Sequence, residues 1–258
     1  MIAVYFIDAF TDKIFTGNPA AVCPLPNWLA DDAMQSIARE NNLSETAFFV
    51  CTDRGVELRW FTPTTEVNLC GHATLATAHV IFNILGHQEQ TIIFQTKSGN
   101  LSARKNGDLL TLDFPILAPH PCDFPPTLLE ALGISPLEVW QAEDYLVVLD
   151  CESKVSQIKP NLELLKQLDR RGVIITAKGD RDDFVSRFFA PKIGIPEDPV
   201  TGSAHCTLIP YWAAKLGKTK LTARQISARG GTIYGELQQD RVLLSGQAVV
   251  YMKGAIAI

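Results

Sequence analysis

The chain has 258 residues, of which 47% are hydrophobic and 20% are charged, and its formal net charge is −5. This length suits one large domain or two ordinary ones, and the composition is that of a globular protein with a sizeable core. The mildly acidic charge and the lack of a strongly basic stretch argue against a nucleic-acid partner.

Residues 1–8 predict a first strand rather than a signal peptide, because no basic lead precedes their apolar run. No apolar stretch approaches the roughly 18 residues that span a bilayer, so no membrane partner is expected. The six cysteines are scattered, without the spacing of metal ligands. They argue against a disulfide scaffold or a zinc site and are compatible with a reduced cytosol, so we expect a cytoplasmic protein without a metal.

The chain contains one internal duplication. Residues 59–63 align with residues 187–191, and after three extra residues Glu66 aligns with Glu197. The same separation of 131 residues then joins four pairs of small residues, which are Gly71 with Gly202, Ala73 with Ala204, Gly86 with Gly217, and Gly99 with Gly230. One register that runs through the same order of structural patterns predicts two matching halves.

Each half is expected to hold a buried helix among strands. In the first half, residues 72–85 are apolar or small on almost every face, which predicts a buried helix ended by Gly86. Its counterpart spans residues 203–216, and Pro210 within it is expected to bend the helix or to delay its start. Hairpins with turns at residues 98–100 and 106–107 follow the first helix, and glycine or polar pairs fill the equivalent places after the second.

These patterns predict an α+β fold with two pseudo-symmetric lobes, each a mixed β-sheet or barrel around a central apolar helix. The lobes are expected at residues 1–115 and 116–258, and the last strand is free to cross back to the first lobe. The proline-rich stretch 115–126 would join them.

Both predicted helices open with a glycine, Gly71 or Gly202, which allows a ligand to approach the backbone. The free N–H groups and the positive dipole end of such a turn suit a carboxylate or a phosphate. His72, Ser203 and Asp198 are the polar residues beside these turns. Together the two turns suggest a pocket lined from both halves.

Glu45 stands immediately before an apolar strand, where burial would suit it for general acid–base catalysis. Arg171 and Gly172 occupy the equivalent place in the second half, so this acidic residue is not duplicated. Structural roles ought to be duplicated and catalytic roles need not be. The asymmetry therefore favours a function for Glu45.

The chain resembles the PhzF family of phenazine-biosynthesis-type isomerases, which share the diaminopimelate epimerase fold. The motifs that carry the resemblance run nearly end to end, at residues 8–11, 17–22, 43–47, 70–74 and 197–205. The resemblance implies a homodimeric enzyme, free of metal and cofactor, whose two lobes close over a small carboxylic acid.

In the family, the glutamate at the position of Glu45 moves a proton between substrate atoms. The resemblance implies that His72 and Asp198 assist this transfer and that Ser203 binds the substrate. Gly71, Ala73, Gly202 and Asn18 complete the candidate substrate-binding set, although Asn18 is by default a turn residue.

Two alternatives stay open at this point. An epimerase or racemase would need a second proton carrier beside Glu45, and Cys70 is the one good candidate. Relatives with the wider fold use two opposed cysteines, but the counterpart of Cys70 is Thr201, which disfavours a two-thiol mechanism. The other alternative is a non-catalytic protein that binds a small metabolite.

Overall fold

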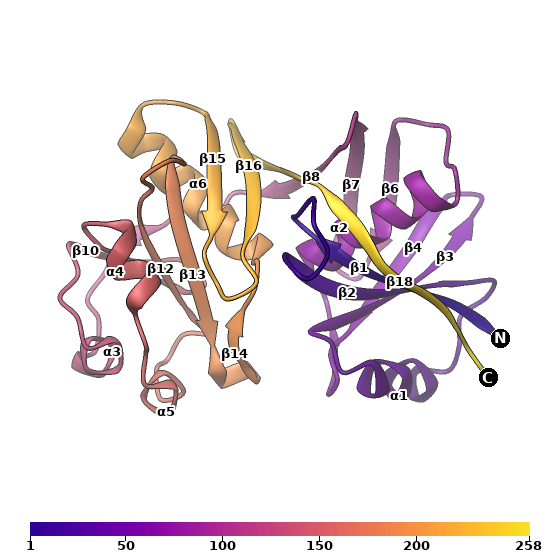
Figure 1. Cartoon of the computed structure of the whole chain (residues 1–258), viewed down its shortest axis with the longest axis horizontal. Coiled ribbons are helices and arrows are strands. Elements are labelled where there is room, and N and C mark those ends of the chain that lie inside the picture. Colours follow the sequence, from indigo (N-terminus) through magenta and orange to yellow (C-terminus); the bar gives the residue numbers. More distant parts are fainter. The chain divides into compact units, whose positions relative to one another are not determined.

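The computed structural model describes all 258 residues, and they form two compact units (Figure 1). Unit 1 consists of residues 1–113 and 245–258, and unit 2 consists of residues 114–244. The chain passes between the units within strands β8 (Leu109–Pro115) and β17 (Arg241–Gly246). No helix in the structure combines the length and the apolar character that a membrane span requires.

Unit 1 is built from one mixed sheet and two helical segments. Besides β8, its elements are β1 (Ile2–Ala9), β2 (Asn18–Leu25), α1 (Asp31–Asn41), β3 (Glu45–Thr52), β4 (Gly55–Phe61), β5 (Glu66–Val67), α2 (Gly71–His79), η1 (Val80–Ile84), β6 (Thr91–Thr96), β7 (Gly99–Asn106) and β18 (Ala248–Ile256). Strand β1 pairs with β18 and β2, β2 runs parallel to β3, and β4 joins β3 to β6. Helix α2 packs against β1, β2, β3 and β18, so the sheet surrounds it.

The predicted buried helix of the first half is present. Residues 72–78 of α2 are all buried, as expected for a segment without a polar face. The last five residues, Val80–Ile84, form a π-helical turn instead of continuing the α-helix. The helix ends before Gly86, which adopts the left-handed conformation with a φ of 75°.

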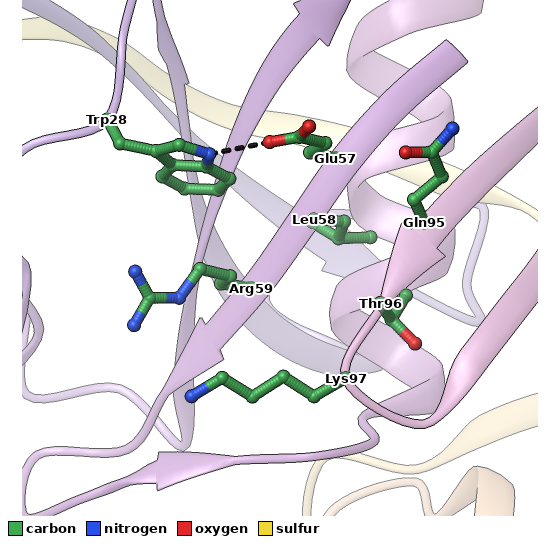
Figure 2. Close-up of a pocket in the computed structure, with 7 residues that line it drawn as sticks. All are labelled: Trp28, Glu57, Leu58, Arg59, Gln95, Thr96 and Lys97. Atoms are coloured by element: carbon green, nitrogen blue, oxygen red, sulfur yellow. Dashed lines mark hydrogen bonds between the residues drawn. The ribbon is translucent and has the colours of Figure 1, made fainter. Parts of the chain in front are cut away.

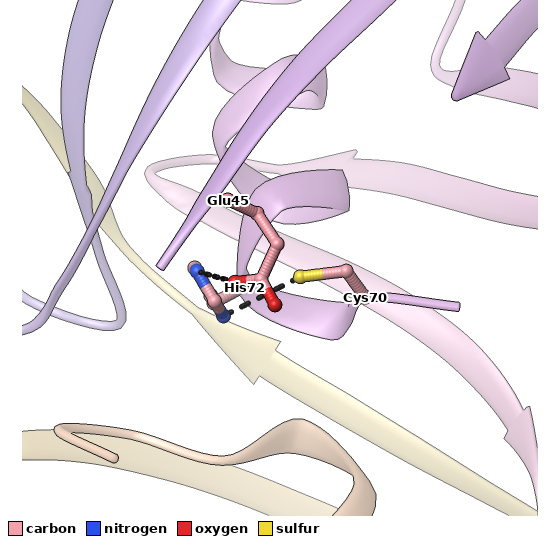
Figure 3. Close-up of side chains that lie close together, drawn as sticks. All are labelled: Glu45, Cys70 and His72. Carbon is pink, nitrogen blue, oxygen red and sulfur yellow. Dashed lines mark hydrogen bonds and ion pairs between the residues drawn. The ribbon is translucent and has the colours of Figure 1, made fainter. Parts of the chain in front are cut away.

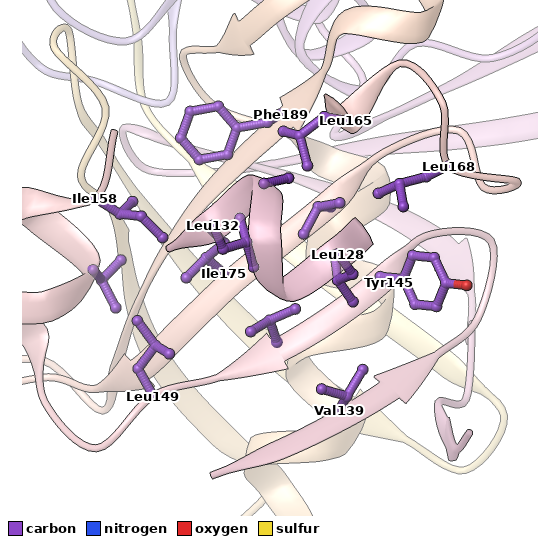
Figure 4. Packing of buried hydrophobic residues seen from close by; sticks show 14 of the residues in the cluster. Leu128, Leu132, Val139, Tyr145, Leu149, Ile158, Leu165, Leu168, Ile175 and Phe189 are labelled. Carbon is purple, nitrogen blue, oxygen red and sulfur yellow. The ribbon is translucent and has the colours of Figure 1, made fainter. Parts of the chain in front are cut away.

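Unit 2 repeats this plan around its own helix. Besides β17, its elements are β9 (His120–Pro121), α3 (Pro126–Leu132), β10 (Glu138–Gln141), β11 (Tyr145–Val148), α4 (Glu152–Gln157), α5 (Leu162–Leu165), β12 (Val173–Lys178), β13 (Phe184–Ala190), η2 (Pro191–Ile193), β14 (Ile195–Asp198), α6 (Gly202–Leu216), β15 (Lys220–Gln225) and β16 (Gly231–Gln238). Strand β11 runs parallel to β12, and β13 joins β12 to β15, as β2, β3, β4 and β6 do in unit 1. A core that includes Leu128, Leu132, Ile175 and Phe189 packs α3 against the sheet (Figure 4).

Helix α6 starts at Gly202 and runs without interruption to Leu216, so the expectation that Pro210 delays its start was wrong. A proline at position 210 cannot donate to the carbonyl of Cys206, four residues before it. That carbonyl instead accepts a hydrogen bond of 3.1 Å from the N–H of Leu117. A donor from outside the helix therefore satisfies the carbonyl that has no donor at the proline.

Candidate active site

Glu45 and His72 lie in contact within unit 1. Glu45 is the first residue of β3 and His72 the second residue of α2, and their side chains are only 10% and 6% exposed. The Glu45 Oε2 atom lies 3.1 Å from His72 Nε2, in an ion pair whose angles are not those of a hydrogen bond (Figure 3). The other carboxylate oxygen of Glu45 makes no hydrogen bond. One oxygen thus faces the imidazole and the other is left to act on a ligand.

The second nitrogen of the same imidazole has its own partners. His72 Nδ1 lies 3.2 Å from the side-chain nitrogen of Asn18, and the Cys70 Sγ atom lies 3.5 Å from it. Asn18 is fully buried as the first residue of β2, so its amide fixes the plane of the ring. The amide nitrogen can donate to a neutral imidazole, or the amide oxygen can accept from an imidazolium after a flip.

Within this cluster the pKa values of His72 and Cys70 are both raised. Burial lowers the pKa of His72, but the neighbouring Cys70 and Glu45 side chains raise it more, so the net pKa lies well above the usual value for histidine. Burial, together with the charge of Glu45, raises the pKa of the Cys70 thiol to about 11. At neutral pH the raised pKa of Cys70 favours a neutral thiol, and the Glu45 carboxylate favours a protonated imidazole at His72.

Glu45, Cys70 and His72 are also the residues in which a metal ion would find three donors, since their ligand atoms lie within 4.8 Å of one another. The carboxylate faces Nε2 of the ring, whereas the sulfur faces Nδ1. One ring nitrogen, the sulfur and one carboxylate oxygen are therefore close enough to become ligands of a single ion. The same closeness suits the exchange of protons among the three groups.

The remaining unit 1 candidates lie at the start of α2. Gly71 is its first residue, and Ala73 is buried in its first turn. No side chain caps α2 at Cys70, and none caps α6 at Thr201. The first N–H groups of both helices are therefore not used by caps and are suited to an anion.

Unit 2 carries the other predicted residues, which do not all contact one another. Asp198 ends β14, is buried, and accepts a hydrogen bond of 2.5 Å from the Thr201 hydroxyl. Gly202 begins α6, and the Ser203 hydroxyl accepts a hydrogen bond of 3.0 Å from Arg171. Ser203 is therefore held by a cation and does not cap its own helix.

Sequence analysis missed the side chains that fix this part of unit 2. Gln225, which is fully buried, accepts from the backbone N–H of Thr201 and donates to the backbone carbonyl of Asp198. Asp144, which is 3% exposed, receives two hydrogen bonds from Arg171. These residues come from other strands or loops, and no local motif marks them.

Two open pockets of unit 1 are lined by residues outside this cluster. One is lined by Trp28, Glu57, Arg59 and Lys97, with Leu58, Gln95 and Thr96 between them (Figure 2). There the Arg59 guanidinium forms ion pairs with Glu66 and Asp31 and lies over the rings of Trp28 and Phe61. A structural ion pair, rather than a free group, therefore dominates this pocket.

The family model described as phenazine biosynthesis-like protein matches residues 7–254. The chain belongs to this family. It is 52% identical to an uncharacterized isomerase of Pseudomonas aeruginosa, over 99% of this chain and 98% of that protein. A PhzF-family protein of Enterococcus faecalis is 47% identical, and its crystal structure matches with a TM-score of 0.98 over 100% of this chain and 99% of that one.

A more distant structure shares the fold alone. The hydroxyproline epimerase of Agrobacterium vitis, with bound trans-4-hydroxy-L-proline, is 11% identical and has a TM-score of 0.60, over 98% of this chain and 91% of that one. These relationships confirm the predicted family and the α+β, epimerase-like fold. They also confirm that the chain is a PhzF-like isomerase. The roles of individual residues remain predictions.

Proposed function

We propose that this enzyme shifts a proton within a small carboxylic acid without a cofactor, and that Glu45 removes and returns the proton. The observation that carries the proposal is a buried carboxylate with one oxygen toward His72 and the other without a partner. A positively charged His72 would lie against the carboxylate that takes the proton from the substrate. After the transfer, the same contact would favour return of the proton.

The other site residues remain predictions within this proposal. The N–H groups at the start of α2, at Gly71 and Ala73, would bind a substrate carboxylate, and Asn18 would hold His72 in place. Asp198, Gly202 and Ser203 would contribute from unit 2. A homodimer likewise stays a prediction from the sequence.

Proton transfer can be tested by isotope exchange. The enzyme would be incubated in heavy water with a panel of small unsaturated and amino-acid carboxylates, including trans-4-hydroxy-L-proline, the ligand of the epimerase with this fold. We expect mass spectrometry to detect deuterium in at least one compound. In Glu45→Gln the rate of deuterium incorporation should fall by at least about 100-fold, which is the usual contribution of a general base. Glu40→Gln, at an exposed position of α1, is the matched control.

Equal exchange by Glu45→Gln and the wild type would remove Glu45 from the mechanism. Tight binding of a compound with no exchange under any condition would favour the non-catalytic alternative.

An epimerase that uses Glu45 with Cys70 is the second candidate. Cys70 Sγ and the Glu45 carboxylate both lie against the ring of His72, one at each nitrogen, which supports a role for the two groups in one reaction. The raised pKa of Cys70 opposes thiolate formation and makes this candidate weaker. Full activity in Cys70→Ser would dismiss it.

A further inference from the structure

Arg171 of unit 2 stands next to the position that is equivalent to Glu45 of unit 1. In unit 1, Thr46 of β3 pairs with Phe61 of β4, and in unit 2 Val173 of β12 pairs with Phe189 of β13. Gly172 is therefore the equivalent of Glu45, and Arg171 stands one residue earlier. Each unit still presents a charged side chain from this segment to the second residue of its buried helix, Glu45 to His72 and Arg171 to Ser203.

The guanidinium of Arg171 is held in one orientation. Its Nε donates to Asp144 over 3.1 Å and its Nη2 over 2.6 Å, while Nη2 also donates to the Ser203 hydroxyl. The guanidinium carbon lies 5.5 Å from the centre of the Phe188 ring, which supports one face. Asp144 is almost fully buried, so the pair cannot swing freely as a surface ion pair would.

One edge of this fixed cation remains available. Nη1 of Arg171 makes no hydrogen bond, and the side chain is 34% exposed. Its two N–H groups and the adjacent start of α6 present donors of the kind that bind a carboxylate. Besides Asp144, the acidic groups near the guanidinium are Glu143, 3.8 Å from Nη2, and Asp198.

A purely structural role for the pair fits the duplication poorly. An arginine–glutamate pair occurs at matching positions of both units, as Arg59 with Glu66 in unit 1 and as Arg187 with Glu197 in unit 2. The Arg171–Asp144 pair occurs in unit 2 alone, just as the Glu45–His72 pair occurs in unit 1 alone. A buried ion pair also contributes little net stability, so stability alone does not account for the Arg171–Asp144 pair.

We infer that Arg171 is a specificity-determining residue that binds an anionic group of the substrate through Nη1, with Ser203 beside it and Asp144 as its positioning residue. The substrate class would be acids, with a carboxylate recognised in unit 2. This inference rests on the proposed function for the substrate class but is independent of the role of Glu45.

Matched acid and amide probes test it. Binding of benzoate, benzamide, L-proline and L-prolinamide to the full chain would be measured by calorimetry. We expect the wild type to prefer at least one acid over its amide, and Arg171→Met to weaken that acid at least about tenfold while leaving the amide unchanged, since the guanidinium–carboxylate bond is charge-assisted. Arg171→Lys, which keeps the charge, should recover part of the preference, and Asp144→Asn should lose part of it.

Arg170→Met is the control, because that neighbouring side chain is also 34% exposed and is paired with Gln141 and Asp169. Its acid affinity should match the wild type, and circular dichroism checks that each variant folds. Arg171→Met should weaken the acid relative to its amide in the Glu45→Gln background as well, which separates this test from that of proton transfer. Failure of both acids to bind, equal affinity for acid and amide, or wild-type acid affinity in Arg171→Met would each overturn the inference.

Discussion

At the scale of the residue, His72 decides what the unit 1 cluster can do. As an imidazolium it can donate toward Glu45 through Nε2, while Nδ1 faces Asn18 and Cys70. The charged ring stabilises the Glu45 carboxylate in surroundings that otherwise disfavour an isolated charge. Removing the ring would leave that carboxylate buried without its partner.

The stability of the fold should therefore depend on His72 in a pH-dependent manner. Because its folded-state pKa is raised above the unfolded value near 6.5, the stabilisation is fully present below that pH and is lost as the pH rises through the folded-state pKa. We expect His72→Gln to lower the free energy of unfolding by about 3 kcal/mol near pH 6, a typical cost of breaking a buried pair. The difference from the wild type should shrink toward high pH.

Urea unfolding at several pH values measures this difference. His120→Gln, at an exposed position, should match the wild type throughout. A destabilisation by His72→Gln that stays constant from acid to alkaline pH would contradict the charged pair.

At the scale of the element, the turn between β1 and β2 places Asn18 against His72. Asp8 accepts a hydrogen bond of 2.9 Å from the N–H of Phe15, and Phe15 itself has a positive φ of 69°. Gly17, also at a φ of 69°, directly precedes Asn18. A Cβ atom at Gly17 would lie 2.3 Å from the backbone oxygen of Ala9, so the backbone can follow this path only with glycine.

Gly17→Ala should therefore displace the start of β2 as well as destabilise unit 1. We expect a loss of at least about 2 kcal/mol, because left-handed strain adds to a backbone clash. Gly107→Ala is the matched control, since Gly107 has a φ of 60° but open space around its Cβ position, and it should lose about 1 kcal/mol. Thermal unfolding compares the two, and equal losses would show that the contact with Ala9 is not limiting.

The elements differ in how far the sequence predicts them. Apolar patterning and glycine spacing predicted α2, α6 and the turns at Gly99 and Gly107, because these depend on residues close in the chain. Of the two outcomes expected at Pro210, the delayed start of α6 was wrong, because the hydrogen bond that compensates the proline comes from Leu117, about ninety residues earlier.

The residues of the candidate site also differ in how far the sequence indicates them. Glu45 and His72 could be singled out because each stands at a predicted element boundary. Arg171 contacts Asp144, and Gln225 contacts the backbone of Thr201, in each case from a separate segment of the chain. No spacing rule in the sequence indicates these contacts.

At the scale of the whole molecule, duplication separates scaffold from chemistry. In unit 1, Arg59 donates to Glu66 and lies 5.1 Å from the centre of the Phe61 ring. In unit 2, Arg187 donates to Glu197 and lies 4.8 Å from the centre of its own phenylalanine ring, that of Phe189. Each pair ties together the two strands that lead into the buried helix of its unit.

We expect Arg59→Met and Arg187→Met to be alike in their main effect. Each should lower the free energy of unfolding by about 1–3 kcal/mol, because a partly buried glutamate loses charge-assisted hydrogen bonds. Arg181→Met, at an exposed position, should have no effect. If one of the two losses were absent, the duplicated pair would not be a shared structural device.

Acid unfolding tests whether the Arg59–Glu66 pair stabilises the fold through the charge of Glu66. The hydrogen bond from Arg59 is the largest of the effects that lower the pKa of Glu66 to about 2. Because this folded-state pKa is depressed, the stabilisation is present above about pH 4.5 and is lost as the pH falls through about 2. The melting temperature of Arg59→Met should therefore fall less steeply than that of the wild type across this window. Parallel curves would mean that Glu66 does not depend on Arg59, and the ion pair would then hold strand β5 by packing rather than by charge.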